Sequence, residues 1–157
     1  MVEPARILVI DDDENIRKVL ETILADEGYN VETAETAKKG IEKSEHAFFN
    51  LALIDVRLPD MEGIELLSKL RNTKPKMRKI IVTGYPTLQN AIAAVNKGAD
   101  AYVMKPFDVE KILQTIKEQL KKQEEEKSFS EEKVVEFIET RIKALETAEQ
   151  STPKRKA

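Results

Sequence analysis

The chain has 157 residues, 41% of them hydrophobic, which is enough to bury the core of one domain and to leave a short appendage. Its formal net charge of −3 argues against a protein that wraps nucleic acid. Cysteine is absent, which excludes disulfides, thiolate catalysis and zinc–thiolate sites, and the N-terminal apolar stretch is too short for a signal peptide or a membrane span. We therefore expect a cytoplasmic protein without a membrane partner.

Short apolar runs alternate along the chain with longer segments of helical periodicity. Residues 7–10, 51–54 and 80–82 have the composition of strands buried on both faces, and 29–34 and 101–104 are weaker strand candidates. A helical pattern follows each candidate, with apolar positions recurring in 16–24, 37–48, 64–70, 91–95 and 109–120. Five such units predict an α/β fold with a doubly wound five-stranded parallel sheet and helices on both faces.

In such a sheet, ligands bind beyond the carboxyl ends of the strands. The residues expected there carry carboxylate, hydroxyl or amine groups: Asp11, Asp12, Asp13, Asp55, Thr83 and Lys105. Clustered carboxylates repel one another unless a cation holds them, and a few oxygen ligands open to water suit Mg²⁺. A carboxylate can also act as a nucleophile toward phosphorus and form an acyl phosphate. The strand ends therefore predict a magnesium site that handles a phosphoryl group.

Four stretches, ILVIDDDENIRKVL, LALIDVRLPDMEGIELL, IIVTGYP and GADAYVMKPF, resemble the receiver domain of two-component response regulators, in order and at the family's spacing. The resemblance covers about residues 4–122, and residues 123–157 then form a helical extension with a basic tail. The segment from Thr83 to Phe107 is most similar to receivers of the nitrogen-regulation class. The resemblance implies a flavodoxin-like strand order of 2-1-3-4-5 and a signalling switch that is phosphorylated by a sensor histidine kinase.

The resemblance also implies a role for each acid. Asp55 corresponds to the phosphoacceptor, and Mg²⁺ is held by Asp11, Asp12, Asp55 and the backbone carbonyl of Arg57. Asp13 is better explained as an acid at the start of the helix that begins near Glu14, where the helix dipole favours negative charge. The metal site therefore needs two of the three consecutive acids.

The remaining roles fall on the later strands. Thr83 and Lys105 match the switch hydroxyl and the phosphate-binding amine of the family, and Tyr102 matches its switch aromatic. Arg57 and Tyr85 occupy the positions whose side chains line the path of the water that removes the phosphoryl group. Both are bulky, so a long-lived phosphorylated state is expected. Gly84 departs from the family, in which alanine is more usual.

Three alternatives stay open at this point. Besides the stand-alone signalling switch, the chain could be a receiver fragment of a larger transcriptional regulator, a phosphatase with an aspartyl nucleophile, or a nucleotide binder on the same fold. Phosphatases of the haloacid dehalogenase kind place a second acid where Arg57 stands, and no glycine-rich phosphate loop follows the first strand. No helix-turn-helix pattern follows residue 122, and the STPKRKA tail has few basic residues, so direct DNA binding is not expected.

The extension carries its own pattern. Ser128 and Glu131 have the spacing of a capping box and predict a new helix that Thr152–Pro153 closes. One apolar stripe follows the box: Val135, Ile138, Ile142 and Leu145, widened by Val134 and Phe137. An isolated helix of this length is marginal in water, so the stripe needs a surface to cover it. We expect a homodimer, and a downstream protein that binds the face formed by the fourth helix, fifth strand and fifth helix.

Overall fold

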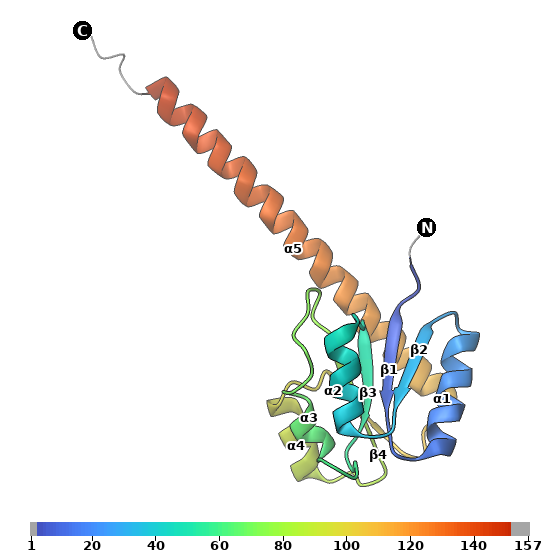
Figure 1. The fold of residues 1–157 in the computed structure, drawn as a ribbon. Coiled ribbons are helices and arrows are strands. Elements are labelled where there is room, and N and C mark those ends of the chain that lie inside the picture. The colour runs from blue at the N-terminus through green and yellow to red at the C-terminus, as the bar shows by residue number, and fades with distance from the viewer. Residues whose placement is uncertain (1–2, 152–157) are drawn as a thin grey trace. The chain divides into compact units, whose positions relative to one another are not determined.

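The computed structural model describes residues 3–151, and the side chains of residues 3–147. The chain divides into two compact units, Met1–Gln123 and Glu124–Ala157. Strands and helices alternate strictly through the first unit (Figure 1). The elements are β1 (Arg6–Ile10), α1 (Glu14–Asp26), β2 (Asn30–Ala34), α2 (Ala37–His46), β3 (Leu51–Asp55), α3 (Gly63–Leu66), β4 (Arg78–Thr83), α4 (Leu88–Asn96), β5 (Ala101–Met104) and α5 (Val109–Ser151).

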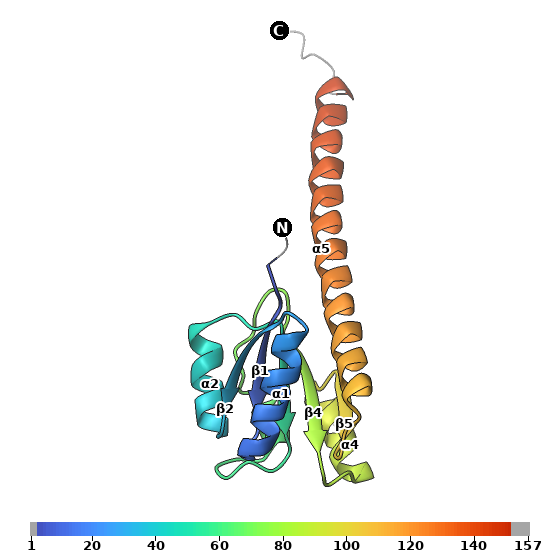
Figure 2. The ribbon, with the colours of Figure 1, turned by 90° about the vertical axis from the view of Figure 1, so that its right-hand side faces the viewer.

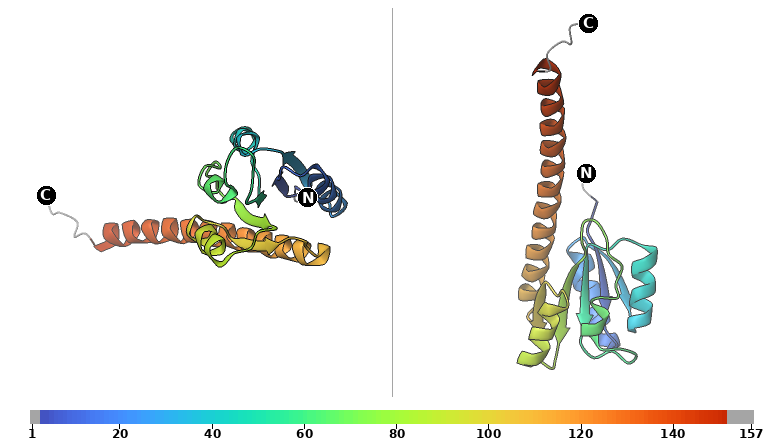
Figure 3. Two further views of the ribbon diagram at one scale, coloured as in Figure 1. Left: turned by 90° about the horizontal axis from the view of Figure 1, so that it is seen from below. Right: turned by 90° about the vertical axis from the view of Figure 1, so that its left-hand side faces the viewer.

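The five strands form one parallel sheet in the order β2-β1-β3-β4-β5, which confirms the predicted α/β architecture and strand order. Helix α1 and the first part of α5 cover one face (Figure 2), whereas α2, α3 and α4 cover the other (Figure 3, right). Strand β1 shows why its sequence is apolar throughout: Ile7 and Val9 enter one core, and Leu8 and Ile10 enter the other.

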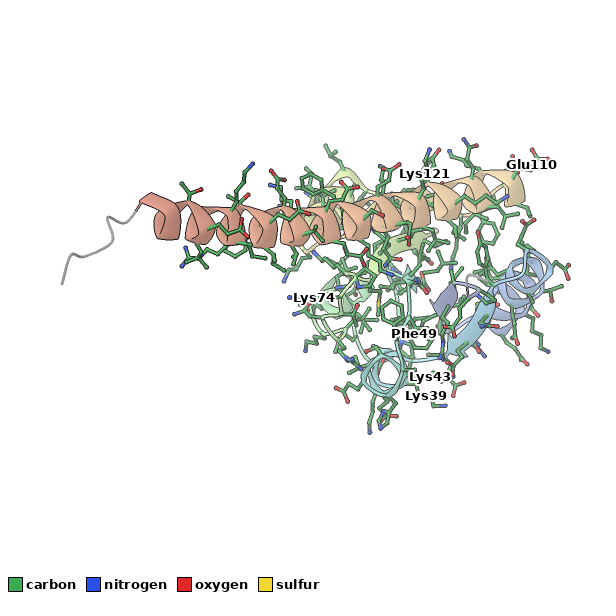
Figure 4. All side chains as sticks on the ribbon, turned by 90° about the horizontal axis from the view of Figure 1, so that it is seen from above. Lys39, Lys43, Phe49, Lys74, Glu110 and Lys121 are labelled. Atoms are coloured by element: carbon green, nitrogen blue, oxygen red, sulfur yellow. The ribbon has the colours of Figure 1, made fainter. Side chains whose placement is uncertain are left out.

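Charged side chains cover the outside of these layers. Phe49, which is fully buried, lies inside the molecule, whereas Lys39 and Lys43 of α2 and Glu110 and Lys121 of α5 point outward (Figure 4). Exposed charge beside a continuous apolar core is the pattern of a stable domain that folds by burying its two sheet faces.

Two helices begin at side-chain caps that also tie neighbouring loops together. The Asp13 carboxylate accepts hydrogen bonds from the amides of Asn15 at 2.8 Å and Ile16 at 3.2 Å, so it is the N-cap of α1, as its position suggested. Helix α2 is capped by Thr36 and also by Asp60, whose two oxygens accept from the first amides of the helix at 2.9 Å. Asp60 therefore holds the β3–α3 loop against α2.

Helix α3 is shorter than its apolar pattern predicted. The expected helix over 64–70 ends at Leu66, although Leu66, Leu67 and Leu70 are all buried. A longer helix would join the Arg71 amide to the Leu67 carbonyl. Instead, that carbonyl accepts a hydrogen bond from the buried Lys79 ammonium, and the Arg71 amide donates to Ser44 Oγ at 3.3 Å. Contacts with β4 and α2 therefore end this helix.

The predicted helix start at Ser128 is wrong. Helix α5 runs without interruption from Val109 to Ser151, so Ser128 and Glu131 are interior helical residues. Between those bounds the sequence contains no proline or glycine, and a capping residue does not by itself end the helix that precedes it. Thr152–Pro153 and the basic tail lie outside the described residues. Within residues 3–151, no helix combines the length and hydrophobicity needed to cross a membrane.

Candidate functional site

Four strands end at the same edge of the sheet, and each supplies a polar side chain there. Asp11 follows β1, Asp55 ends β3, Thr83 ends β4, and Lys105 follows β5. The parallel pairing of these strands brings together groups that are far apart in the sequence, such as Lys105 and Asp11, which are 94 positions apart and in direct contact. Asp11, Asp12, Asp55 and Lys105 lie together at this edge, and Thr83 ends its strand at the same edge.

Three carboxylates form the floor of the site. Asp11 and Asp55 are buried, at 3% and 7% exposure, whereas Asp12 is exposed to solvent. One oxygen from each of the three lies within 4.8 Å of the others. Such a set of oxygen donors, partly open to water, fits a hard cation such as Mg²⁺, which keeps several of its waters.

Lys105 neutralises part of this negative charge. Its Nζ lies 2.8 Å from Asp11 Oδ2 and 3.5 Å from Asp55 Oδ1. Burial alone would lower the pKa of Lys105, but the hydrogen bond and charge of Asp11, with the charge of Asp55, raise it above its ordinary value. Lys105 is therefore a permanent cation between two acids.

Asp55 stands out electrostatically among the acids. Burial and the neighbouring charge of Asp11 raise its pKa from 3.8 to about 6, although Lys105 and the Arg57 amide act in the opposite direction. A carboxyl group held in this way gains from any additional positive charge. The site is therefore prepared for a cation that would favour the ionised form of Asp55.

Thr83 ends β4 and Tyr102 lies in the neighbouring strand β5. Thr83 is fully buried, and its Oγ1 accepts a hydrogen bond from the Tyr85 amide at 2.9 Å. Tyr102 packs against the core that α4 helps to form, and burial raises the pKa of its hydroxyl. Strands β4 and β5 are paired, with Tyr102 beside Ile81 and Thr83 beside Met104, and Thr83 O accepts a hydrogen bond from the Lys105 amide at 2.7 Å.

The loop after Asp55 is folded tightly back on the strand. Arg57 pairs with Glu62 in an isolated antiparallel bridge, and the Gly63 amide donates to the Val56 carbonyl at 2.6 Å. A Cβ on Gly63 would lie 1.9 Å from the backbone oxygen of Asp55. The sequence marked Gly63 only as a turn, but glycine is required here because the loop backbone touches the residue that it positions.

Two side chains lie against each other beside the acids. The Arg57 guanidinium stacks on the Tyr85 ring, 3.7 Å from its centroid. Sequence analysis singled out both residues for their bulk, but it did not foresee that they contact each other. No local pattern could have shown this, because one residue follows β3 and the other follows β4.

An apolar groove adjoins Lys105, and sequence analysis missed it. It is lined by Asn15, Ile16, Val19, Lys105, Pro106 and Phe107. No sequence signal pointed to it, because Val19 fits the apolar helical pattern of residues 16–24 and only the structure shows that it is 48% exposed. The groove places a hydrophobic surface next to the charged site.

The fold is a parallel α/β sheet with three acids and a lysine clustered at its carboxyl edge, and comparison with known proteins identifies the family. The family model of the response regulator receiver domain matches residues 7–117. The chain belongs to the response regulator receiver family, as the four motifs indicated.

Several known proteins are similar over the first unit. A CheY-like receiver domain protein from Methanospirillum hungatei has a solved structure with 52% identity and a TM-score of 0.75, covering 78% of this chain and 98% of that one. The beryllofluoride-activated NtrC4 receiver domain dimer has 36% identity and a TM-score of 0.71, covering 75% of this chain and 98% of its own. Response regulator ArlR of Staphylococcus aureus is 33% identical over 118 residues, which are 75% of this chain and 53% of ArlR. The chain thus spans about half the length of the curated relatives it matches.

Proposed function

We propose that this chain is a phosphorylation-operated switch in which Asp55 accepts a phosphoryl group from a sensor histidine kinase. The observation that carries the proposal is Asp55 itself, a buried carboxylate with a raised pKa, 3.5 Å from Lys105 and clustered with two further acids. Asp11, Asp12 and Asp55, with the backbone carbonyl of Arg57, would hold Mg²⁺. When bound, Mg²⁺ supplies positive charge that offsets the repulsion between the acids and an incoming phosphoryl group.

The proposed chemistry is a simple group transfer. An Asp55 carboxylate oxygen attacks phosphorus, the bond between phosphorus and the donor's imidazole nitrogen breaks, and the imidazole leaves with that electron pair. Lys105 then exchanges its contact with Asp55 for a phosphoryl oxygen. The acyl phosphate adds charge and acceptor oxygens at a position where Lys105 is already present.

The proposed switch starts at Thr83. Its hydroxyl leaves the Tyr85 amide and donates to a phosphoryl oxygen, which alters the β4–α4 loop and the packing of Tyr102 under α4. The surface that would respond is apolar: Leu88, Ile92 and Val95 of α4 are 77%, 52% and 69% exposed, and Met104 of β5 is 55% exposed. We assign this face of α4, β5 and α5 to a downstream protein, and we propose that a second copy of the chain is also a partner.

We also propose a docking place for the kinase. A phosphodonor has to reach Asp55 from the solvent side, and the apolar groove includes Lys105, which contacts Asp55. A helix with a hydrophobic face and a phosphorylated histidine fits these two neighbouring features. Substituting Val19 by Glu should therefore slow transfer from a kinase while leaving transfer from a small phosphodonor unchanged.

A turnover enzyme is the weaker alternative. A phosphatase that uses an aspartyl nucleophile needs a second acid near the leaving group, and Arg57 occupies that position with its guanidinium stacked on Tyr85. As the switch proposed here, in contrast, the chain catalyses only its own phosphorylation and slow dephosphorylation. A fragment of a larger regulator agrees with all of these observations, and the receiver would comprise residues 4–122 in either case.

The central experiment measures phosphate incorporation from a small acyl or amido phosphate with and without Mg²⁺. We expect incorporation on Asp55 only with the metal, and none in Asp55→Asn. Lys105→Arg keeps the charge but not the compact donor, so labelling should continue while the change in partner affinity is lost. Labelling of Asp55→Asn at the wild-type rate would refute the assignment, and rapid release of phosphate from a phosphomonoester would favour the enzyme.

A further inference from the structure

The second unit exposes large apolar side chains that a lone helix has no means to cover. Seven of them between residues 129 and 145 are 49–69% exposed: Phe129, Val134, Val135, Phe137, Ile138, Ile142 and Leu145. Each would be stabilised by burial, and together they form a surface of the kind that marks an interface. The question is what covers it.

The net charge of this helical segment limits the classes of partner that could cover this surface. Residues 124–147 carry eight acidic and four basic side chains, a net charge of −4. A helix of this charge is repelled by nucleic acid and by anionic lipid. The exposed ring of Phe129 already makes a cation–π contact with Lys133, whose Nζ lies 5.0 Å from the ring centroid. By helical periodicity, Val135, Ile138, Ile142 and Leu145 lie on the other side of the helix from Phe129, whereas Phe137 does not, and these four residues favour a protein partner.

Four of those residues form a continuous seam. Val135, Ile138, Ile142 and Leu145 follow one another at steps of three, four and three, which is the spacing of the core positions of a coiled coil. Val135 and Ile142 fall at the positions where β-branched residues favour two strands, and Leu145 falls where leucine does; Ile138, at the other position of that second kind, departs from the two-stranded preference. The seam fits a second copy of the same helix.

The charges beside the seam decide its direction. One flank carries Glu132, Glu139 and Glu146, and the other carries Val134 and Arg141. In a parallel pair, Arg141 of each chain faces Glu146 of the other, which gives two attractive contacts. An antiparallel pair that matches Val135 with Leu145 would instead set Glu139 against Glu139 and Arg141 against Arg141. Only the parallel arrangement is electrostatically favourable.

We propose that residues 132–147 of α5 form a parallel, in-register, two-stranded coiled coil with a second copy of this chain. The inference rests on the homodimer proposed above and names its interface, but it does not depend on phosphorylation of Asp55. Two heptads bury little surface, so the association should be reversible at micromolar concentrations.

Sedimentation of the full chain tests the seam. We expect a dimer at tens of micromolar and a monomer for the variant Ile138→Glu with Ile142→Glu, with the dissociation constant raised about 100-fold or more. Thr140→Glu, which adds a charge opposite the seam, is the matched control and should remain dimeric. A wild-type monomer, or equal effects of the two variants, would overturn the proposal. Circular dichroism of each variant identifies loss of folding.

The direction is tested by cross-linking, because the chain has no cysteine of its own. In the parallel pair, Val135→Cys should form a disulfide with itself on oxidation, and so should Leu145→Cys. Cross-linking that appears only when the two variants are mixed would establish the antiparallel pair and overturn the proposal. Arg141→Glu should weaken the parallel dimer, because it places a glutamate opposite Glu146, and adding Glu146→Arg should restore it. In the antiparallel pair Arg141→Glu only exchanges one like-charge contact for another, so that single variant should leave the affinity almost unchanged.

Phosphate incorporation from a small phosphodonor distinguishes a failure of the coiled-coil proposal from a failure of the proposed phosphorylation of Asp55. The monomeric variant should incorporate phosphate as the wild type does, since its substitutions lie outside the first unit. Loss of the dimer with normal labelling would support both proposals. A dimer without labelling would refute the function of Asp55 and leave the coiled coil intact.

Discussion

At the scale of single residues, Asp55 shows how a site can oppose the stability of its own fold. Its pKa is raised to about 6 by burial and by Asp11, so the folded protein holds a proton there that the unfolded chain releases near its ordinary pKa of 3.8. Stability without metal should therefore fall as the pH rises from about 4 to above 6, because over that interval the folded state binds more protons.

Asp55→Asn removes this cost. Without metal at pH 7.5, we expect the variant to be more stable than the wild type by about 1–3 kcal/mol, and the difference should vanish below about pH 4. Added Mg²⁺ should stabilise the wild type and not the variant, because binding to the folded state alone raises its stability. Urea unfolding between pH 4 and 8 measures both effects. A wild type whose stability does not change between pH 4 and 7 would contradict the raised pKa.

The stack of Arg57 on Tyr85 makes a second prediction at this scale. Hydrolysis needs a water in line with the bond from phosphorus to the aspartate oxygen, and we propose that this stacked pair lies beside that approach. Replacing Arg57 by Asn and Tyr85 by Ala should speed dephosphorylation about tenfold, which corresponds to about 1.4 kcal/mol. Tyr85→Phe keeps the ring and should keep the wild-type lifetime. Equal lifetimes of the phosphorylated protein in all variants would show that the stack does not shield the site.

At the scale of elements, the end of β3 and the start of α3 act as one rigid piece. Gly63 contacts the backbone of Asp55, and Asp60 caps α2, so the loop between them is fixed at both ends. This arrangement explains how the loop of residues 56–62 can hold the Arg57 carbonyl where a metal ligand is proposed.

Gly63→Ala should therefore harm both stability and function. Its Cβ would lie 1.9 Å from the Asp55 oxygen, and backbone has to move to relieve that contact. We expect a loss of about 2 kcal/mol or more in unfolding free energy, together with slower phosphorylation. Gly84→Ala is the control at the same site, because the nearest atom to its Cβ, Lys105 Cβ, is 3.9 Å away. Equal stability of the two variants would mean that the loop is not held as tightly as this contact implies.

At the scale of the whole molecule, two buried glutamines mark where α5 leaves the core. Gln119 and Gln123 are 5% and 4% exposed, and Gln123 Nε2 donates to the carbonyls of Asn50 at 2.9 Å and Lys76 at 2.8 Å. These bonds satisfy backbone groups at the end of the sheet opposite the acids. A chain that ends at Gln123 keeps them, so it should fold without the second unit.

If the chain self-associates through its second unit, the full chain and the chain ending at Gln123 should differ in how their melting temperatures depend on protein concentration. The melting temperature of the full chain should rise with protein concentration, because association favours the folded state by mass action, whereas that of the chain ending at Gln123 should not. Calorimetry from about 5 to 500 µM covers the expected range of dissociation constants. Concentration dependence that persists in the shorter chain would instead place the interface on the exposed face of α4.

The alternation of apolar runs and helical patterns determined the α/β fold, because strands buried on both faces and amphipathic helices are local properties of the sequence. The parallel sheet then brought Asp11, Asp55, Thr83 and Lys105 to one edge, since strand ends coincide in such a sheet. The continuous α5 was misread because Ser128 and Glu131 resemble a helix start, although nothing before them ends a helix.

Contacts between distant segments decided the rest. Helix α3 ends where the Lys79 ammonium donates a hydrogen bond to the carbonyl of its C-cap residue. Arg57 stacks on Tyr85, which follows a different strand. Gly63 has to be glycine because its loop folds back onto the backbone of Asp55. None of these follows from neighbouring residues, because each depends on which surfaces the packed sheet brings within a few ångströms. The pKa of Asp55 has the same origin: burial and the charge of Asp11 exist only once β1 and β3 lie side by side.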